Sequence, residues 1–276
     1  MNLDIHIIDT CNRNCGNCFH YSCIAKKSNE KNSLYFEELF KTLHPSIKDL
    51  FSNINILGGE PFLNKDLKNI IQSFRKYFCK NTIIIFTNGI ILTEGLRNKD
   101  SEIINIINTI IENNVKIFVS VHSNDYQNYK KELMELMKSN GFKIDFITVL
   151  ECNSFIKIDF EMKDNKVIAN DANENYKKCI VKPVPNKFFT TFQLVGNKLI
   201  GCAKAAYCYI LNEYLDNKII LNDSDQLDIS KVESKEEIIN FINKGHLDFC
   251  KYCVIDNSIK VPCNVCKDYK QFLKCN

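Results

Sequence analysis

Short apolar runs alternate with amphipathic stretches over the first 150 residues of the chain. The apolar runs lie at residues 3–8, 53–57, 82–87, 116–121 and 143–150. Between them, apolar side chains recur at helical spacing in sets that begin at Leu34, Leu67, Ile103 and Tyr126. Gly141 follows the last set and is a typical helix stop. Alternating strands and helices of this kind predict an α/β fold built on a parallel sheet.

The pattern changes towards the C-terminus. Two more strands are predicted at residues 188–195 and 198–202, and Gly196-Asn197 between them is a strong signal for a tight hairpin. The first part of the chain holds five strand–helix units, and too few residues are left for three more of the same size. We therefore expect an open or partial barrel rather than a closed eight-stranded one.

A later helix is also marked in the sequence. Ser234 and Glu237 have the spacing of a capping box at its start, and Gly245 follows as a stop. Because the strand–helix alternation ends before this region, we expect two domains. The first covers residues 1–165 and the second covers residues 166–276.

Composition adds one unusual feature, which is 14 cysteines in 276 residues. The first residues, Met-Asn-Leu-Asp, include the acidic Asp4 where a secretory signal would carry positive charge. We therefore expect a cytoplasmic, reducing setting. Cysteines there more often serve metals or catalysis than disulfides. No apolar run reaches the roughly 18 residues of a membrane span. A net charge of +3 with three arginines, Arg13, Arg75 and Arg97, argues against nucleic acid as a partner.

Three cysteines follow the first predicted strand. Cys11, Cys15 and Cys18 have CxxxCxxC spacing on a loop. Three thiolates leave one iron of a [4Fe-4S] cluster without a protein ligand, and a free iron can bind a substrate or cofactor. A three-cysteine zinc site and unpaired buried thiols are the alternatives for this motif.

A glycine-rich motif follows the second predicted strand. Residues 57–61 read Leu-Gly-Gly-Glu-Pro, with the glycines at Gly58 and Gly59. Glycines let a backbone come close to a ligand, and ligands bind at the C-terminal ends of parallel strands. Taken alone, the motif is equally typical of a turn before the next helix.

Together with residues 86–89, Phe-Thr-Asn-Gly after the third strand, these motifs resemble those of the radical SAM superfamily. The resemblance covers residues 3–150 and implies a partial (β/α)6 barrel of TIM type. It implies that Cys11, Cys15 and Cys18 hold three irons, while the fourth iron binds S-adenosylmethionine (SAM). The implied contacts to SAM are Gly58, Gly59, Glu60, Asn88 and Ser120.

One position departs from the family pattern. The family usually has an aromatic residue just before the third cysteine, packed near the adenine of SAM, and Asn17 stands there in this chain. Phe19 and His20 follow the cysteine and are the nearest replacements. We therefore expect Phe19 to contact the cofactor in place of the missing aromatic residue.

Eight cysteines lie after the predicted barrel. Four of them resemble the ligands of the twitch and SPASM extensions, which have one cysteine before a hairpin, one at its end and a CxxC beyond a helix. The resemblance implies one auxiliary [4Fe-4S] cluster held by Cys179, Cys202, Cys250 and Cys253. A second auxiliary cluster would use Cys208, Cys263, Cys266 and Cys275. The alternatives are simple buried thiols and a zinc knuckle formed by Cys250, Cys253, Cys263 and Cys266.

The resemblance of the two cysteine regions to known cluster sites predicts a radical reaction. The resemblance implies reductive cleavage of SAM to a 5′-deoxyadenosyl radical, which takes hydrogen from a substrate. An auxiliary cluster that accepts the second electron favours dehydrogenation of a small polar molecule, such as a sugar. A flavodoxin or ferredoxin would be the electron donor. A further likeness, at residues 18–22 and 247–253, is to radical SAM proteins of polysaccharide loci.

Alternative functions remain open at this point. His122 is a candidate substrate contact or base, and Cys208, Cys23 or Cys152 would act as hydrogen donor if the enzyme were an epimerase. Peptide maturation is less expected, because no extension precedes the cluster loop. A different class would be a non-catalytic iron–sulfur or zinc module for electron transfer. Cys79 has no assigned role.

Overall fold

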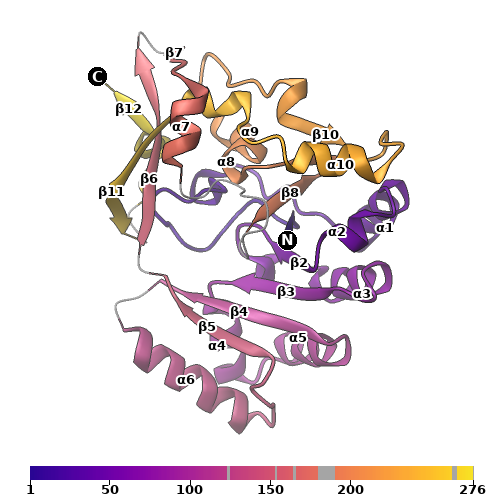
Figure 1. Ribbon diagram of the computed structural model, residues 1–276. Helices are drawn as coiled ribbons and strands as arrows, with labels where there is room; N and C mark the ends of the chain where they lie inside the picture. The colour runs from indigo at the N-terminus through magenta and orange to yellow at the C-terminus, as the bar shows by residue number, and fades with distance from the viewer. Residues whose placement is uncertain (123–124, 153, 164–165, 180–189, 263–265, 276) are drawn as a thin grey trace.

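The computed structural model describes the chain except for residues 123–124, 153, 164–165, 180–189, 263–265 and 276. Its largest layer is an eight-stranded sheet with the order β10-β9-β8-β1-β2-β3-β4-β5 (Figure 1). The strands are β1 (Asn2–His6), β2 (Asn53–Leu57), β3 (Thr82–Thr87), β4 (Val115–Val121), β5 (Ile147–Glu151), β8 (Thr191–Val195), β9 (Lys198–Ile200) and β10 (Gln226–Asp228). The strands from β8 to β5 in this order are parallel, and β9 pairs antiparallel with both β8 and β10.

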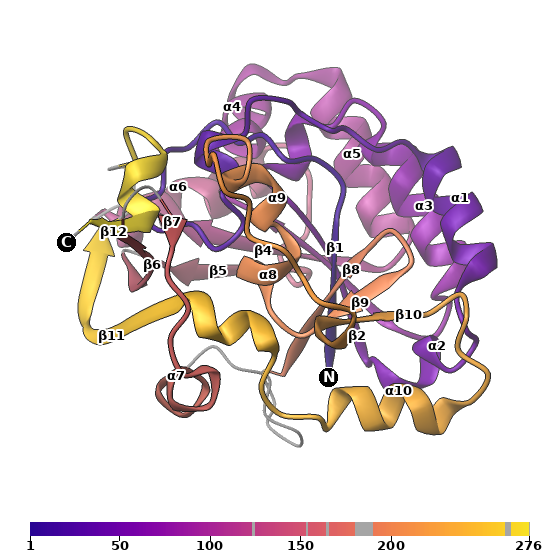
Figure 2. The ribbon, with the colours of Figure 1, turned by 90° about the horizontal axis from the view of Figure 1, so that it is seen from above.

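Helices cover one face of this sheet. Seen from above, α1, α3 and α5 lie in a row along it (Figure 2). The helices of this layer are α1 (Ser33–Thr42), α2 (Ile47–Leu50), α3 (Leu67–Tyr77), α4 (Ile90–Asn98), α5 (Ser101–Glu112), α6 (Tyr126–Ser139) and α10 (Lys235–Ile242). Their apolar stripes pack on alternate strand residues such as Ile54, Ile83 and Ile117, which are fully buried. Within the described residues, no helix is long and apolar enough to cross a membrane.

The expected alternation of strands and helices is confirmed, and the fold is a partial TIM-type barrel. Its sheet is open, because β5 and β10 stand at opposite ends of the strand order. Gly141 adopts a positive φ of 84° just after α6, and Gly196 adopts 57° in the hairpin between β8 and β9. Ser234 caps α10 by accepting a hydrogen bond from the backbone N–H of Glu237.

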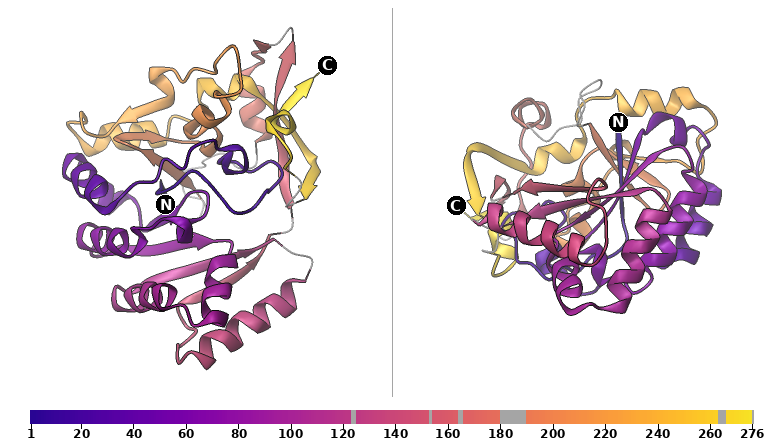
Figure 3. Two further views of the ribbon diagram at one scale, coloured as in Figure 1. Left: turned by 180° about the vertical axis from the view of Figure 1, so that it is seen from behind. Right: turned by 90° about the horizontal axis from the view of Figure 1, so that it is seen from below.

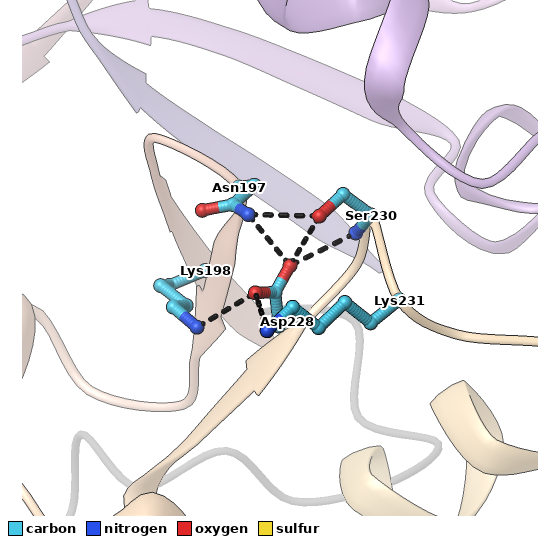
Figure 4. Close-up of polar contacts among 5 residues, drawn as sticks. All are labelled: Asn197, Lys198, Asp228, Ser230 and Lys231. Atoms are coloured by element: carbon cyan, nitrogen blue, oxygen red, sulfur yellow. Dashed lines mark hydrogen bonds and ion pairs between the residues drawn. The ribbon is translucent and has the colours of Figure 1, made fainter.

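The predicted hairpin has an unexpected place. Its first strand, β8, pairs with β1 in parallel, so the hairpin extends the main sheet although it comes after residue 165. Next to it, Asp228 on β10 accepts hydrogen bonds from Asn197, Lys198 and Ser230 (Figure 4). The bonds from Ser230 and Lys198, together with the Lys198 charge, lower the pKa of Asp228 to about 2. The division into residues 1–165 and 166–276 stays a prediction.

A second, smaller sheet lies beside the first, as the views from behind and below show (Figure 3). Its strands are β6 (Ser154–Lys163), β7 (Lys166–Val167), β11 (Cys253–Pro262) and β12 (Leu273–Cys275). Short helices surround it, namely η1 (Ser22–Ile24), α7 (Ala172–Lys178), α8 (Ala203–Ala206), α9 (Cys208–Leu211), η3 (Asp223–Asp225), η4 (Asp248–Tyr252) and η5 (Tyr269–Phe272). Tyr21 packs in the core of this sheet with Phe160 and Phe272. The segment after the first cysteine motif therefore joins the two parts of the molecule.

Candidate active site

The three N-terminal cysteines lie on the loop after β1, which we call the cluster loop (residues 9–20). Cys11, Cys15 and Cys18 all line one cavity of about 520 Å³. Burial raises the pKa of Cys11 to about 12 and also raises that of Cys18. Since a buried thiolate needs a positive partner, and iron provides one, this set of donors fits an iron–sulfur cluster.

A single metal ion and an iron–sulfur cluster need their ligands at different spacings. Among the described residues, no three His, Cys, Asp or Glu side chains gather closely enough to hold one ion. In a [4Fe-4S] cluster each cysteine binds a different iron, so the ligand sulfurs stand farther apart than around a single zinc ion. The assignment of the first motif to a cluster rests on the match of this part of the chain to a 4Fe-4S domain, which is given below.

The glycine motif is hydrogen-bonded to the backbone at the start of the cluster loop. The backbone N–H of Gly59 donates to the carbonyl of Ile8 at 2.8 Å, and that of Glu60 donates to the carbonyl of Thr10 at 3.0 Å. A Cβ at Gly59 would lie 1.8 Å from the Thr10 oxygen. The close approach that demands glycine here is to the chain's own backbone, although Gly58 and Gly59 also line the cavity.

Glu60 lies just behind the cavity wall. Its side chain is fully buried and is not among the described residues that line the cavity. One carboxylate oxygen accepts from the Thr87 hydroxyl at 2.6 Å, and the other accepts from the backbone N–H of Asn88 at 2.8 Å. Burial raises the pKa of Glu60, while these bonds lower it. The carboxylate thus joins the ends of β2 and β3 beneath the site.

The other predicted cofactor contacts come together at the first cavity. Asn88, Ser120 and Phe19 line it, and so does His122. The Asn88 amide donates to the Asn12 side chain at 2.7 Å and to the Cys11 sulfur at 3.6 Å. The cavity therefore gathers polar groups from the ends of β3 and β4 around the three thiols.

His122 stands at the rim of this cavity. Its Nδ1 lies 2.9 Å from the carbonyl oxygen of Cys152. Burial lowers the pKa of His122, but hydrogen bonding with Cys152 and the nearby Cys15 raise it, and the net direction is upwards. The other catalytic candidate, Cys208, is not among the residues that line the first or the second cavity.

The C-terminal thiols surround a second cavity of about 710 Å³. The thiols that line it are Cys179, Cys202, Cys250 and Cys253. They come from the end of α7, the end of the hairpin and the η4–β11 junction, so segments far apart in sequence meet here. Burial raises the pKa of Cys250 to about 12, and the neighbouring Cys202 raises it further. These four thiols suit an iron–sulfur cluster for the same reason as the first three.

The remaining cysteines group differently from the sequence alternatives. Cys266 hydrogen-bonds with Cys23, and the Gln271 amide contacts both sulfurs. The backbone N–H of Cys266 donates to the carbonyl of Asn14 on the cluster loop at 3.0 Å. Cys208 is buried, and burial together with the nearby Cys202 raises the pKa of its thiol to about 12. Cys266 therefore lies by the first motif, whereas Cys250 and Cys253 line the second cavity.

Two members of the alternative sets are not described in full. Cys263 lies outside the described residues, and of Cys275 only the backbone, in β12, is described. Cys208 and Cys266, the described members of the second auxiliary set, line neither cavity. A second auxiliary cluster stays a prediction.

Sequence reasoning missed a buried lysine between the two groups of thiols. Lys204 is 2% exposed, and its Nζ donates to Asn17 Oδ1 at 3.0 Å. Burial lowers the pKa of Lys204 to about 8, while Cys253 and, less strongly, Cys18 raise it. Asn17, the departure from the family pattern, is thus the partner of this ammonium. A lysine two residues after Cys202 carried no motif that would have revealed it.

Comparisons with known proteins agree with this arrangement. Residues 5–140 match the family model of a 4Fe-4S single cluster domain. A GTP 3′,8-cyclase from Clostridium acetobutylicum is 22% identical over 279 residues, covering 94% of this chain and 77% of that protein. Its counterpart from Aquifex aeolicus is 26% identical over 247 residues, covering 88% of this chain and 64% of that protein.

A solved structure has the same fold. BtrN, in complex with AdoMet and 2-DOIA, is 17% identical with a TM-score of 0.50, over 91% of this chain and 92% of that one. Fold, cysteine motif and relatives define an iron–sulfur enzyme with an open α/β barrel. The chain belongs to the radical SAM superfamily, and its cofactors are a [4Fe-4S] cluster and SAM.

Proposed function

We propose that this radical SAM enzyme is an oxidoreductase that dehydrogenates a small polar substrate, with one auxiliary [4Fe-4S] cluster as electron acceptor. The supporting observation is that the two thiol-lined cavities share a boundary formed by Asp4, Phe19, His20 and Thr191. A substrate at this boundary would lie between the two groups of cysteines. That position suits a reaction in which one group starts the oxidation and the other receives the second electron.

The chain's own residues would divide the work as follows. Cys11, Cys15 and Cys18 would hold the first cluster, and Cys179, Cys202, Cys250 and Cys253 the auxiliary one. When bound, the first cluster and SAM supply a 5′-deoxyadenosyl radical that takes a hydrogen atom from an unactivated carbon. The proposed polar and aromatic contacts to SAM are Gly58, Gly59, Asn88, Ser120 and Phe19, with Glu60 holding the strand ends in position. A flavodoxin or ferredoxin would reduce the first cluster.

Iron counting and product analysis test this proposal. Anaerobically reconstituted protein should hold about eight irons per chain and release 5′-deoxyadenosine from SAM when dithionite is added. Cys15→Ala should lose about four irons and all SAM cleavage. Cys79→Ala, which removes an exposed thiol, is the matched control and should change neither. Unchanged iron and SAM cleavage in Cys15→Ala would contradict the cluster assignment.

A second candidate, radical epimerisation, is favoured by one observation. The Cys23 thiol lines the first cavity and hydrogen-bonds with Cys266, so it is placed to return a hydrogen atom to a substrate radical. Substrates for either reaction can be sought in a panel of sugars, cyclic polyols and GTP, since the relatives are GTP cyclases. In D₂O, an epimerase incorporates one deuterium into its product at carbon, whereas a dehydrogenase yields a ketone.

A further inference from the structure

Three neighbouring strands carry polar side chains that line the two adjoining cavities, and we call this surface the floor. Asp4 on β1 stands opposite Asn55 on β2 and Gln193 on β8. The Asn55 amide donates to one Asp4 oxygen at 2.7 Å, and the Gln193 amide donates to the other at 3.0 Å. Asp4 is 8% exposed, Asn55 5% and Gln193 3%. A buried carboxylate held from both sides is a built feature of this floor, since burial without such bonds would be costly.

Unused hydrogen-bond acceptors remain in this group. The side-chain oxygen of Asn55 is buried and has no partner among the described residues. Gln193 Oε1 already accepts from the Tyr207 hydroxyl at 3.1 Å. Asp4 can accept more than the two bonds it receives. A ligand that bonds to the Asp4 carboxylate or to the Asn55 oxygen has to bring donors of its own.

We propose that Asp4 and Asn55 bind the substrate through two neighbouring donors, and that Asp4 takes the hydroxyl proton during oxidation. The substrate class is then a vicinal diol or an amino alcohol. This inference rests on the proposed function, since it names the substrate class and proton acceptor of that site. Asp4 borders both cavities, and Asn55 borders the first.

The oxidation balances with these groups. The carbon of a secondary alcohol loses its hydrogen atom to the 5′-carbon of the deoxyadenosyl radical, so one C–H bond breaks and another forms. The O–H proton moves to an Asp4 oxygen. The electron left on the substrate radical passes to a one-electron oxidant of the iron–sulfur class. The carbon–oxygen single bond then becomes the C=O double bond of a ketone.

The environment of Asp4 suits a proton acceptor. Burial raises the pKa of Asp4 to about 6, while the bonds from Asn55 and Gln193 lower it. Near neutral pH the group is therefore mainly carboxylate, and it is a stronger base than an exposed carboxylate.

The test uses matched probes on reconstituted holoenzyme with SAM. trans-1,2-Cyclohexanediol carries two donors, and trans-1,2-dimethoxycyclohexane has the same ring and oxygens but no donor. Equilibrium dialysis should show that the wild type binds the diol in preference to the diether. Asp4→Asn should weaken diol binding by about 10- to 100-fold, as expected for the loss of a charged acceptor. Asn55→Leu should weaken it about threefold to tenfold.

Controls separate this proposal from the proposed function. Asn53→Leu changes an amide on the same strand that is not among the residues lining the cavity, and its diol affinity should equal that of the wild type. Iron content in Asp4→Asn should equal that of the wild type, which shows that the variant folds. Failure of the wild type to prefer the diol, or equal affinity in Asp4→Asn, overturns the proposal. Missing iron or SAM cleavage in the wild type would overturn the proposed function instead.

Discussion

Replacing Gly59 by alanine tests the contact between the glycine motif and the cluster loop. The added Cβ would lie 1.8 Å from the carbonyl oxygen of Thr10 and 2.8 Å from that of Asp9. Both atoms belong to backbone, so no side-chain rotation relieves the clash. The cluster loop and the end of β2 must therefore move apart.

The structure allows the cost to be estimated. Separation would break the bonds from the N–H of Gly59 to Ile8 and from the N–H of Glu60 to Thr10, each worth about 0.5–1.5 kcal/mol. Forcing a methyl group into packed surroundings adds about 1–3 kcal/mol. We expect Gly59→Ala to lose about 2–6 kcal/mol of folding free energy, which lowers the melting temperature by at least about 4 °C.

Thermal unfolding followed by circular dichroism, together with iron content after reconstitution, measures this effect. Gly141→Ala is the control, because Gly141 has a positive φ of 84° but nothing within 4 Å of an added Cβ. It should cost about 1–2 kcal/mol and retain full iron. The reasoning is refuted if Gly59→Ala has the same melting temperature as Gly141→Ala and binds as much iron.

Three further predictions concern other parts of the molecule. Cys250→Ser should hold about four irons fewer than the wild type while still cleaving SAM, as iron analysis and chromatography will show; loss of all iron would contradict separate sites. Lys204→Met should make the reduction potential of the auxiliary cluster more negative in a redox titration followed by EPR, because it removes a buried positive charge. Lys177→Met, which removes an exposed charge at the same cavity, should leave the potential unchanged. Equal potentials in Lys204→Met and the wild type would refute an influence of Lys204 on the cluster. Asp228→Asn should lower stability to urea by about 1 kcal/mol at pH 7. Since the folded pKa of Asp228 is depressed to about 2, the difference should be constant above about pH 4 and vanish as pH falls through 2; a constant difference at all pH values would contradict this.

The barrel strands and the helices on them were predictable, because their apolar patterns are strong and local. Runs such as residues 82–87 are buried on both faces, as parallel strands in this fold class require. The cysteine spacing likewise predicted that Cys11, Cys15 and Cys18 lie together, and all three line one cavity. Residue type and spacing were sufficient there, since all three stand on one short loop.

Features that depend on pairing between distant segments were not predictable. β6 is mostly half-buried and joins β11 and β12, about 100 residues further on, so its own pattern is weak. The place of β8 beside β1 follows from tertiary packing, and it alone brings Gln193 to Asp4. An acidic residue in the middle of a buried strand was the available signal for the Asp4 site.

The cluster loop depends on parts of the chain that are made long after it. Asn17 bonds to Lys204, which is 187 residues away, and Asn14 bonds to the backbone of Cys266. During synthesis the three cysteines leave the ribosome early, but these partners do not yet exist. The loop reaches its final form only after residues 266–272 have emerged and packed. Iron insertion is therefore expected to follow synthesis of this C-terminal segment, and truncation there should yield protein poor in iron at its N-terminal site.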